Sequence, residues 1–194
     1  MKNITLILTL LIGLLTNGLA QSSWSPDMAH SSVNFTIEHM GISLVQGRFE
    51  SFEGEVKTMA DDFSDMQVDF TLDATSINTG VNQRDEHIKS PDMLDVAQYP
   101  TMHFVSTSVT KTAEDEYDVT GNMTMHGITN IVTLHVVYHG QAIDSYKNVK
   151  AGLSVTGIID RYAFGVEYNM PIDGGKFLIG KTMQFESYLE LVKE

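Results

Sequence analysis

The sequence predicts an all-β domain of about eight antiparallel strands. Apolar and polar residues alternate along most of the chain, as in SVNFTIEH at residues 32–39, and a period of two is typical of strands with one buried face. Turn-forming residues separate these segments at regular intervals. None of the 194 residues is cysteine, so the stability of an exported chain must come from packing and sheet closure.

Residues 1–20 have the features of a secretory signal peptide. A single basic residue, Lys2, precedes an apolar run from Ile4 to Leu15, and small residues lead to Ala20. We expect cleavage after Ala20, a single domain over residues 21–194 and a periplasmic location. The lack of cysteine leaves no site for a lipoprotein anchor.

The acidic composition excludes several classes of partner. The formal net charge is −13, which argues against nucleic acid and against electrostatic docking on anionic lipid. After the signal, no segment is long and apolar enough to span a bilayer. We therefore expect no nucleic-acid partner and no stable membrane insertion.

The first two predicted strands differ in the regularity of their apolar residues. Val33, Phe35 and Ile37 keep one phase, whereas the second segment, about residues 45–57, changes phase between Phe49 and Phe52. A one-residue slip would turn the later apolar residues outward. We therefore predict a β-bulge near residues 50–51.

Six further strands follow, with one interruption. A third strand carries Met66, Val68, Phe70 and Leu72 on one face. Residues 78–100 lose the alternation and are predicted to form a helical or irregular crossing segment. The remaining five strands have these apolar residues: Met102 and Phe104; Tyr117, Val119, Met123 and Met125; Val132, Leu134, Val136 and Tyr138; Leu153, Val155 and Ile159; Met183, Phe185, Leu189 and Leu191.

Eight such strands can close into a barrel or stack as a sandwich, and closure would remove the exposed edges. A barrel of this size is either filled by its side chains or holds one small ligand. The predicted interior includes glycines, such as Gly121 and Gly157, which leave space, and methionines, such as Met123, which can reshape around an apolar ligand. A packed core and a ligand cavity both remain open at this point.

A series of short motifs, in one order from Trp24 to about Leu191, resembles the YceI-like family. The motifs are Trp24-Ser25-Pro26-Asp27, His30-Ser31-Ser32-Val33, His39-Met40-Gly41, Gly47-Arg48-Phe49, Ser76-Ile77, Thr79-Gly80, Arg84-Asp85, His87-Ile88-Lys89-Ser90-Pro91, Tyr99-Pro100, Gly121-x-Met123-Thr124-x-His126-Gly127 and Arg161-x-x-Phe164-Gly165. The resemblance implies a periplasmic, lipocalin-like eight-stranded antiparallel barrel. It also implies a bound polyisoprenoid, isoprenoid quinone or similar long-chain lipid, no other cofactor, and a homodimer as a state to be tested.

The resemblance implies that residues on the apolar faces of the strands bind the ligand inside the barrel. These are Phe35, Ile37, His39, Phe49, Phe52, Phe70, Phe104, Met123, Met125, Leu134, Val136, Leu153, Val155, Phe164 and Phe185. The mouth or head-group candidates are Arg84, His87, Met93, Leu94 and Arg161. Many relatives carry paired phenylalanines where this chain has Met93 and Leu94, a change that affects the expected shape or length of the ligand.

The histidines do not form a metal motif. His135 and His139 would share a face of one strand but lie roughly 13 Å apart, too far to share one ion. The familiar local signatures of hydrolases and nucleotide enzymes are missing. We therefore expect a non-catalytic binding protein for carriage, storage or stress protection. The alternatives are a filled-core stress, adhesion or metal-binding module that acts through its surface and, less favoured, a lipid-processing hydrolase.

Overall fold

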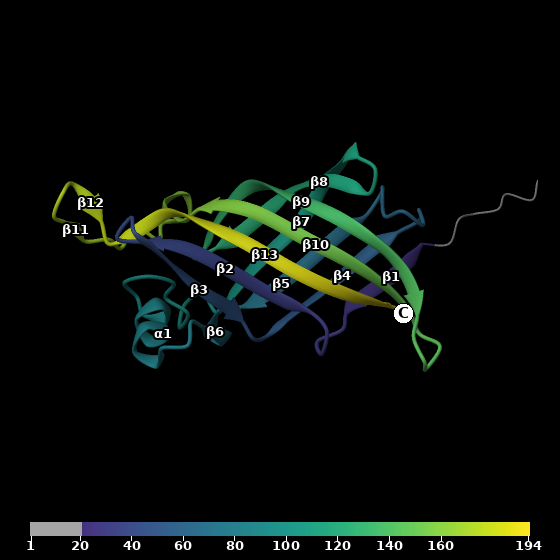
Figure 1. Ribbon diagram of the computed structural model, residues 1–194, viewed down its shortest axis with the longest axis horizontal. Coiled ribbons are helices and arrows are strands. Elements are labelled where there is room, and N and C mark those ends of the chain that lie inside the picture. The colour runs from purple at the N-terminus through teal and green to yellow at the C-terminus, as the bar shows by residue number, and fades with distance from the viewer. Residues whose placement is uncertain (1–20) are drawn as a thin grey trace, which may run out of the picture.

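The computed structural model describes residues 21–194, so the predicted signal peptide lies outside the described residues. Figure 1 shows an elongated molecule built almost entirely of strands. The strands are β1 (Ser22–Pro26), β2 (Ser32–His39), β3 (Ser43–Phe49), β4 (Phe52–Thr58), β5 (Gln67–Asp73), β6 (Ile77–Asn78), β7 (Thr101–Ala113), β8 (Glu116–Met125), β9 (Ile128–Ile143), β10 (Val149–Asp160), β11 (Pro171–Ile172), β12 (Lys176–Phe177) and β13 (Ile179–Lys193). The helices are η1 (Ala74–Ser76), α1 (Asn82–Lys89) and η2 (Arg161–Phe164).

Eight strands close into an antiparallel barrel in the order β1, β4, β5, β7, β8, β9, β10, β13, and β13 pairs back to β1. This confirms the predicted fold class. The long strand β13 has two partners on one side. Its last residues pair with β1, and its earlier part pairs with β2, where Phe185 is opposite Phe35. Strands β2, β3 and β6 therefore extend the wall toward the end that carries α1 (Figure 1).

The predicted bulge near residues 50–51 is wrong. Strands β3 and β4 are separate: β3 pairs with β2 and β6, whereas β4 pairs with β1 and β5. The backbone N–H groups of Glu50 and Ser51 donate to the carbonyl and hydroxyl oxygens of Ser76, at 3.2 and 3.0 Å, instead of joining a ladder. The apolar phase changes because one strand ends and another begins with a new set of neighbours.

The crossing segment contains a short helix, as predicted, and packs over one end of the barrel. Asp85 on α1 is buried, and its carboxylate accepts a hydrogen bond from the backbone N–H of Thr79 at 2.9 Å. This bond and a second one from the Thr79 hydroxyl tie the helix to the end of β6. The turn after α1 buries Met93 and Leu94 beneath it.

The loop between β4 and β5 closes the opposite end of the barrel (Figure 1). At its centre Phe63 has a φ of 61° and no exposed surface, and its ring lies 5.2 Å from Trp24 and 5.1 Å from Tyr138. Tyr117 donates a hydrogen bond to the carbonyl of Asp62 at 2.7 Å. Residues from β1, β8 and β9 therefore hold an aromatic plug in this end of the barrel.

Candidate functional site

An inner cavity of about 90 Å³ lies within the barrel. Its walls come from β2, β4, β5, β7, β8, β9, β10 and β13, and Ser187 supplies the one hydroxyl among otherwise apolar lining residues. Eight predicted interior residues line it: Phe70, Phe104, Met123, Leu134, Val136, Leu153, Val155 and Phe185. The barrel core is thus partly open rather than completely filled.

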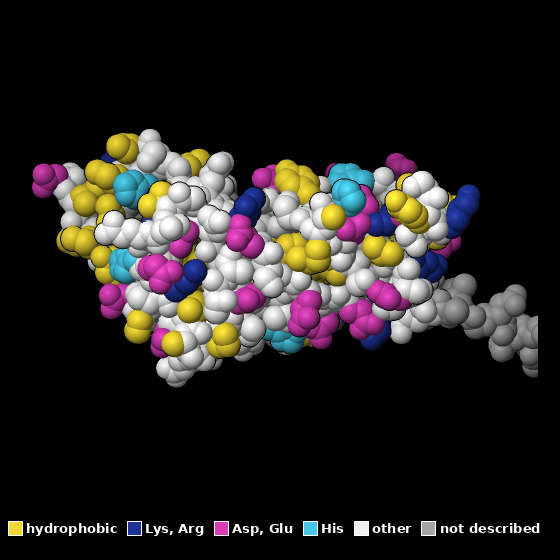
Figure 2. All heavy atoms as spheres, turned by 90° about the horizontal axis from the view of Figure 1, so that it is seen from below, with side chains coloured by type: hydrophobic (Ala, Val, Ile, Leu, Met, Phe, Trp, Pro, Cys, Tyr) yellow, Lys and Arg dark blue, Asp and Glu magenta, His cyan; other side chains and the backbone are white. Residues whose placement is uncertain are grey.

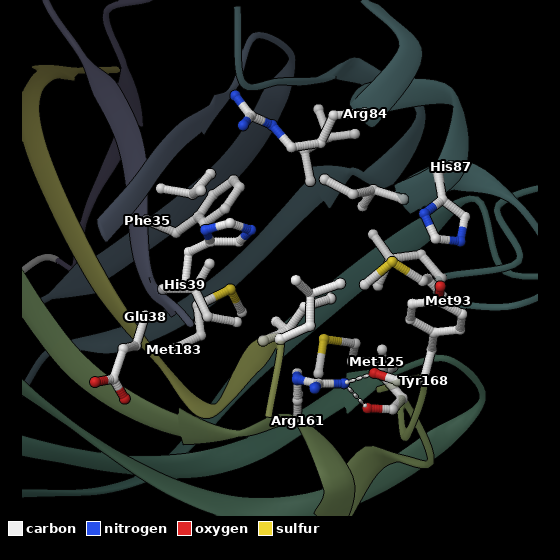
Figure 3. Close-up of a pocket in the computed structure, with 18 of the residues that line it drawn as sticks. Phe35, Glu38, His39, Arg84, His87, Met93, Met125, Arg161, Tyr168 and Met183 are labelled. Carbon is white, nitrogen blue, oxygen red and sulfur yellow. Dashed lines mark hydrogen bonds between the residues drawn. The ribbon is translucent and has the colours of Figure 1, made fainter. Parts of the chain in front are cut away.

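An outer cavity of about 230 Å³ lies between the barrel and α1 (Figure 3). Five predicted interior residues line it: Phe35, Ile37, His39, Phe49 and Met125. All five mouth candidates, Arg84, His87, Met93, Leu94 and Arg161, line it as well. The sequence-predicted residues are therefore gathered around two neighbouring spaces.

The two cavities meet at Met102, which lines both. Aromatic rings stand between them: Phe49 lies 5.8 Å from Phe35 and 6.3 Å from Phe185, measured between ring centroids. Phe35 and Phe49 line the outer cavity, whereas Phe185 lines the inner one. A ligand longer than either space would pass this boundary.

Two predicted interior residues line neither cavity. Phe52 stacks on Phe70 with 5.7 Å between ring centroids, so it supports the wall from behind a lining residue. Phe164 is buried in η2, outside the strand alternation, and its carbonyl lies 3.3 Å from Nδ1 of His126. Both side chains are buried and contribute to core packing rather than to a cavity wall.

Sequence reasoning missed several lining residues. Met66, Val68, Met102 and Met183 belong to apolar faces that were recognised, so the signal for them was present. Tyr168 and Leu178 lie in the irregular stretch between η2 and β13, where no periodicity marks an inward side chain.

Glycines opposite aromatic rings help to keep the interior open. A Cβ atom at Gly54 would lie 2.3 Å from the ring of Phe70, and one at Gly121 would lie 2.6 Å from the ring of Phe104. Gly54 is directly opposite Phe70 in the register of β4 and β5. Each ring therefore lies along the wall over a glycine, an arrangement that a side chain at that position would forbid.

Arg161 is the most deeply buried charged group at the outer cavity, with only 3% of its surface exposed. Nε donates to the carbonyl of Gly180 at 2.8 Å, and Nη1 donates to the carbonyls of Val166 and Tyr168 at 2.6 and 3.0 Å. Burial lowers the pKa of Arg161 from its ordinary value, but a guanidinium stays protonated in proteins. The residue places a buried positive charge at a cavity whose lining also includes Glu38, His39, Arg84 and His87.

The other polar side chains at this cavity are engaged differently. Arg84 donates from Nε and Nη2 to the hydroxyl and carbonyl oxygens of Thr79, at 2.7 and 2.8 Å, and Figure 3 shows its guanidinium directed away from Met93 and Arg161. The ring of His87 meets Tyr168 edge-on at 4.7 Å. Neither side chain contributes an unpaired group comparable with Arg161.

One cluster of residues has the ligand types of a metal site. Donor atoms of Asp27, His30 and Glu190 lie within 4.8 Å of one another. However, Nζ of Lys150 lies 2.5 Å from Asp27 and 3.2 Å from Glu190, so an ammonium already supplies the positive charge. We therefore read this cluster, which lines neither cavity, as a structural ion-pair network.

Comparison with known proteins decides the family. The family model of the YceI-like domain matches residues 24–191. This chain belongs to the YceI-like family. A UPF0312 protein of Staphylococcus aureus strain USA300 is 34% identical to it over 165 residues, which cover 84% of this YceI-like chain and 94% of that protein. A UPF0312 protein of Vibrio parahaemolyticus is 30% identical over 158 residues, covering 81% and 82% respectively.

Solved structures share the fold of this YceI-like chain. Burkholderia cenocepacia BcnA superposes with a TM-score of 0.73 at 23% identity, covering 85% of this chain and 98% of BcnA. A polyisoprenoid-binding domain from Saccharophagus degradans, implicated in plant cell wall breakdown, superposes with a TM-score of 0.65 at 17% identity, covering 88% and 98%. None of the helices in residues 21–194 has the length and apolar character needed to cross a membrane.

Family membership and site chemistry both favour binding over catalysis. In the described part of this YceI-like chain, the inner cavity has a serine, Ser187, but no histidine, and the outer cavity has His39 and His87 but no serine. A hydroxyl nucleophile requires a base within hydrogen-bond reach. His139 does lie 2.6 Å from the hydroxyl of Ser154, but this exposed pair lines neither cavity. His135 bonds to Asp118.

Proposed function

We propose that this YceI-like protein is a non-catalytic binding protein that encloses a long apolar amphiphile, such as a polyisoprenoid or an isoprenoid quinone. The observation that carries the proposal is the pair of adjoining apolar cavities, with charged groups only at the outer one. Such a layout matches a molecule with one polar end and a long hydrocarbon chain. The binding described for the Saccharophagus degradans domain supports the same ligand class.

Binding of a long chain requires the interior to rearrange. A dry apolar cavity of about 150 Å³ holds a molecule the size of benzene. Volumes of about 230 and 90 Å³ are therefore too small for a polyisoprenoid as they stand. Met102 lies at the junction, and Met123 and Met183 line the two spaces. Unbranched methionine side chains can change rotamer at low cost, and this would join the cavities around a ligand.

Hydrophobic transfer supplies the driving force. Burying about 300 Å² of isoprenoid surface would contribute about 7 kcal/mol, which is offset by several kcal/mol of lost translational, rotational and side-chain freedom. Contacts along the chain would be tolerant of its detailed structure because they are not directional. Selectivity would then come from cavity length and from the polar end.

The ligand would enter at the end that carries α1, because the Phe63 plug fills the other end. Apolar side chains stand exposed there on the β2–β3 turn and on β12: Ile42 is 77% exposed and Phe177 57%. The backbone N–H of Met40 donates to the carbonyl of Leu178 at 2.9 Å, which places these segments side by side. Figure 2 shows apolar side chains gathered at this end of the molecule.

We infer the cellular role from the predicted export of the protein and from reversible binding of its lipid. Residues 1–20 have the composition of a signal peptide, so we place the protein in the periplasm. A soluble barrel there would carry or store a lipid that water cannot dissolve, or protect it under stress. Association into a homodimer is compatible with this role and would be measured directly by the mass of the purified protein.

A cavity-filling substitution tests the proposed function. Val155 lines the inner cavity, so Val155→Phe would reduce its volume, whereas Thr156→Phe places the same ring on the exposed face of β10. Binding of geranylgeraniol to lipid-stripped protein is expected to weaken about tenfold or more in Val155→Phe and to be unchanged in Thr156→Phe. Equal affinity in both variants, with the fold retained, would place the lipid outside the barrel. Recovery of chemically altered geranylgeraniol would indicate catalysis.

A further inference from the structure

We propose that Nη2 of Arg161 forms the head-group subsite of the outer cavity and donates a hydrogen bond to an acceptor oxygen at the polar end of the ligand. The ligand would then be neutral or anionic at that end, with its chain running inward past Phe49 to the inner cavity. This inference rests on the proposed function and specifies the chemistry of the ligand's polar end.

Arg161 has one hydrogen-bond donor that is not used. Nε and Nη1 of Arg161 together donate to three backbone carbonyls, whereas Nη2 is buried and has no hydrogen-bond partner among residues 21–194. Buried polar groups are almost always paired, and one left without an acceptor is costly, more so when it is charged. An acceptor supplied by the ligand would remove this cost.

The guanidinium of Arg161 lies 4.7 Å from the ring centroid of Tyr162, which stabilises its charge in part. Across the described residues, no carboxylate oxygen lies within 4.0 Å of the guanidinium of Arg161. The adjacent Asp160 is paired with Lys181, 2.9 Å away, on the barrel surface. Hydrogen bonds from a charged, buried donor are stronger than those between neutral groups in water. An oxygen acceptor is therefore favoured next to Arg161, and an ammonium head is repelled there, because Glu38, the carboxylate that lines this cavity, forms no ion pair with Arg161.

Arg161 lies beside Met125 and Tyr168 on the barrel side of the outer cavity, as Figure 3 shows, whereas Arg84 lies at the opposite edge. No solvent reaches Nη2, so a ligand oxygen would contact it only after a neighbouring side chain moves. Met125 and Met183 line the same cavity and have the flexibility for this movement. Chain binding and head-group binding would thus involve the same rearrangement.

Ligands with one chain and different ends provide the test. Lipid-stripped wild-type protein would be titrated with geranylgeraniol, geranylgeranoic acid, geranylgeranylamine and the corresponding hydrocarbon. The acid, the alcohol or both are expected to bind about tenfold or more tighter than the hydrocarbon, because one charge-assisted hydrogen bond is gained, and the amine is expected to bind least tightly. Preference for the acid over the alcohol would indicate that the natural ligand has an anionic head. Equal binding of the acid and the alcohol would indicate a neutral head.

Two outcomes separate the failure of this inference from failure of the proposed function. If hydrocarbon, alcohol, acid and amine all bind equally, the barrel holds the chain but has no head-group subsite at Arg161, and the inference is overturned. If none of the four binds, the proposed function itself is wrong.

Variants then assign the preference to one residue. Arg161→Gln removes the charge, and Arg48→Gln, at an exposed arginine of β3 that lines neither cavity, is the control. The preference for oxygen heads over the hydrocarbon is expected to vanish in Arg161→Gln and to persist in Arg48→Gln; the reverse pattern would contradict the assignment. Arg161 also bonds Gly180, Val166 and Tyr168, so thermal melting is used to check that Arg161→Gln is folded. If it is not, Arg161→Lys, which keeps the charge but loses the forked geometry, should show a reduced preference.

Discussion

The ring of Phe35 on β2 covers Gly47 on β3, where the two residues are directly opposite in the register. A Cβ atom at position 47 would lie 2.4 Å from Cζ of Phe35, closer than any real contact. The ring can therefore lie along the wall instead of filling the outer cavity. Similar pairs at Gly54 and Gly121 indicate that the open interior is encoded by the choice of small residues beneath large ones.

Substitution of Gly47 by valine should push Phe35 away from the wall. Overpacking of this kind costs about 1–3 kcal/mol, although valine itself favours the strand conformation. We expect Gly47→Val to lower the free energy of unfolding by that amount and to weaken prenyl lipid binding, as measured by urea denaturation and ligand titration. Gln46→Val, on the exposed face of β3, is the control. Unimpaired binding by a folded Gly47→Val protein would show that Phe35 does not shape the binding space.

The aromatic plug at the far end should be a major source of stability. Phe63→Ala removes a fully buried ring that contacts Trp24 and Tyr138, so the free energy of unfolding should fall by about 3–5 kcal/mol. Met59→Ala, at a half-exposed position in the same loop, should change it by less than about 0.5 kcal/mol. If a urea titration gave the same loss of unfolding free energy for both variants, the loop would not be a tightly packed plug.

The turn after α1 should influence which chain length is accepted. Met93 and Leu94 are buried and line the outer cavity, so replacing both by phenylalanine would reduce its space. The double variant should favour geranylgeraniol over longer prenols by several-fold relative to the wild type. Ile131→Phe, on the exposed outer surface of β9, should leave this ratio unchanged. A double variant with the wild-type ratio would exclude the turn from selection of chain length.

The ion pairs of Lys150 should make stability depend on acid pH. Its ammonium, and to a lesser extent His30, holds the pKa of Asp27 well below the ordinary value of 3.8. Because the unfolded state then binds the proton more tightly, Asp27 stabilises the fold above about pH 4, and this contribution is lost as the pH falls further. Lys150→Met should lower the melting temperature at pH 7 and have a smaller effect at pH 3.

Lys57→Met is the control for this prediction, because Lys57 pairs with Glu55 on the exposed surface, where an ion pair contributes little. A Lys150→Met effect that is as large at pH 3 as at pH 7 would show that packing of the lysine stem, rather than its charge, stabilises this region.

The barrel could be predicted from the sequence because alternation reports directly which face of a strand is buried. The same signal failed where strands are short or change partners. β1 contains one large apolar residue, Trp24, so no periodicity marks it, and the phase change before Phe52 has the same appearance in sequence whether it is a bulge or a new strand. Strand partners are set by contacts between residues far apart in the chain.

As with the fold, part of the candidate site could be predicted from the sequence. Lining residues on long strands, such as Phe104 and Leu134, follow from alternation, and Met93 and Leu94 follow from the family motif. The unused donor of Arg161 does not, because its bonded carbonyls lie in the irregular stretch after η2 and at the start of β13, which only the folded chain brings together. Phe63 was also missed, since a buried ring in a turn rich in aspartate has no periodic signature.

Extraction of the native ligand tests the central claim most directly. The full-length chain would be expressed in a bacterium, purified from the periplasm without detergent and extracted with organic solvent for mass spectrometry, beside a lipid-free control protein. The expected result is a near-stoichiometric prenyl lipid with an oxygen-containing, uncharged or anionic head. A folded protein that yields no lipid and does not take up added geranylgeraniol would contradict it and would direct attention to the outer surface of the barrel.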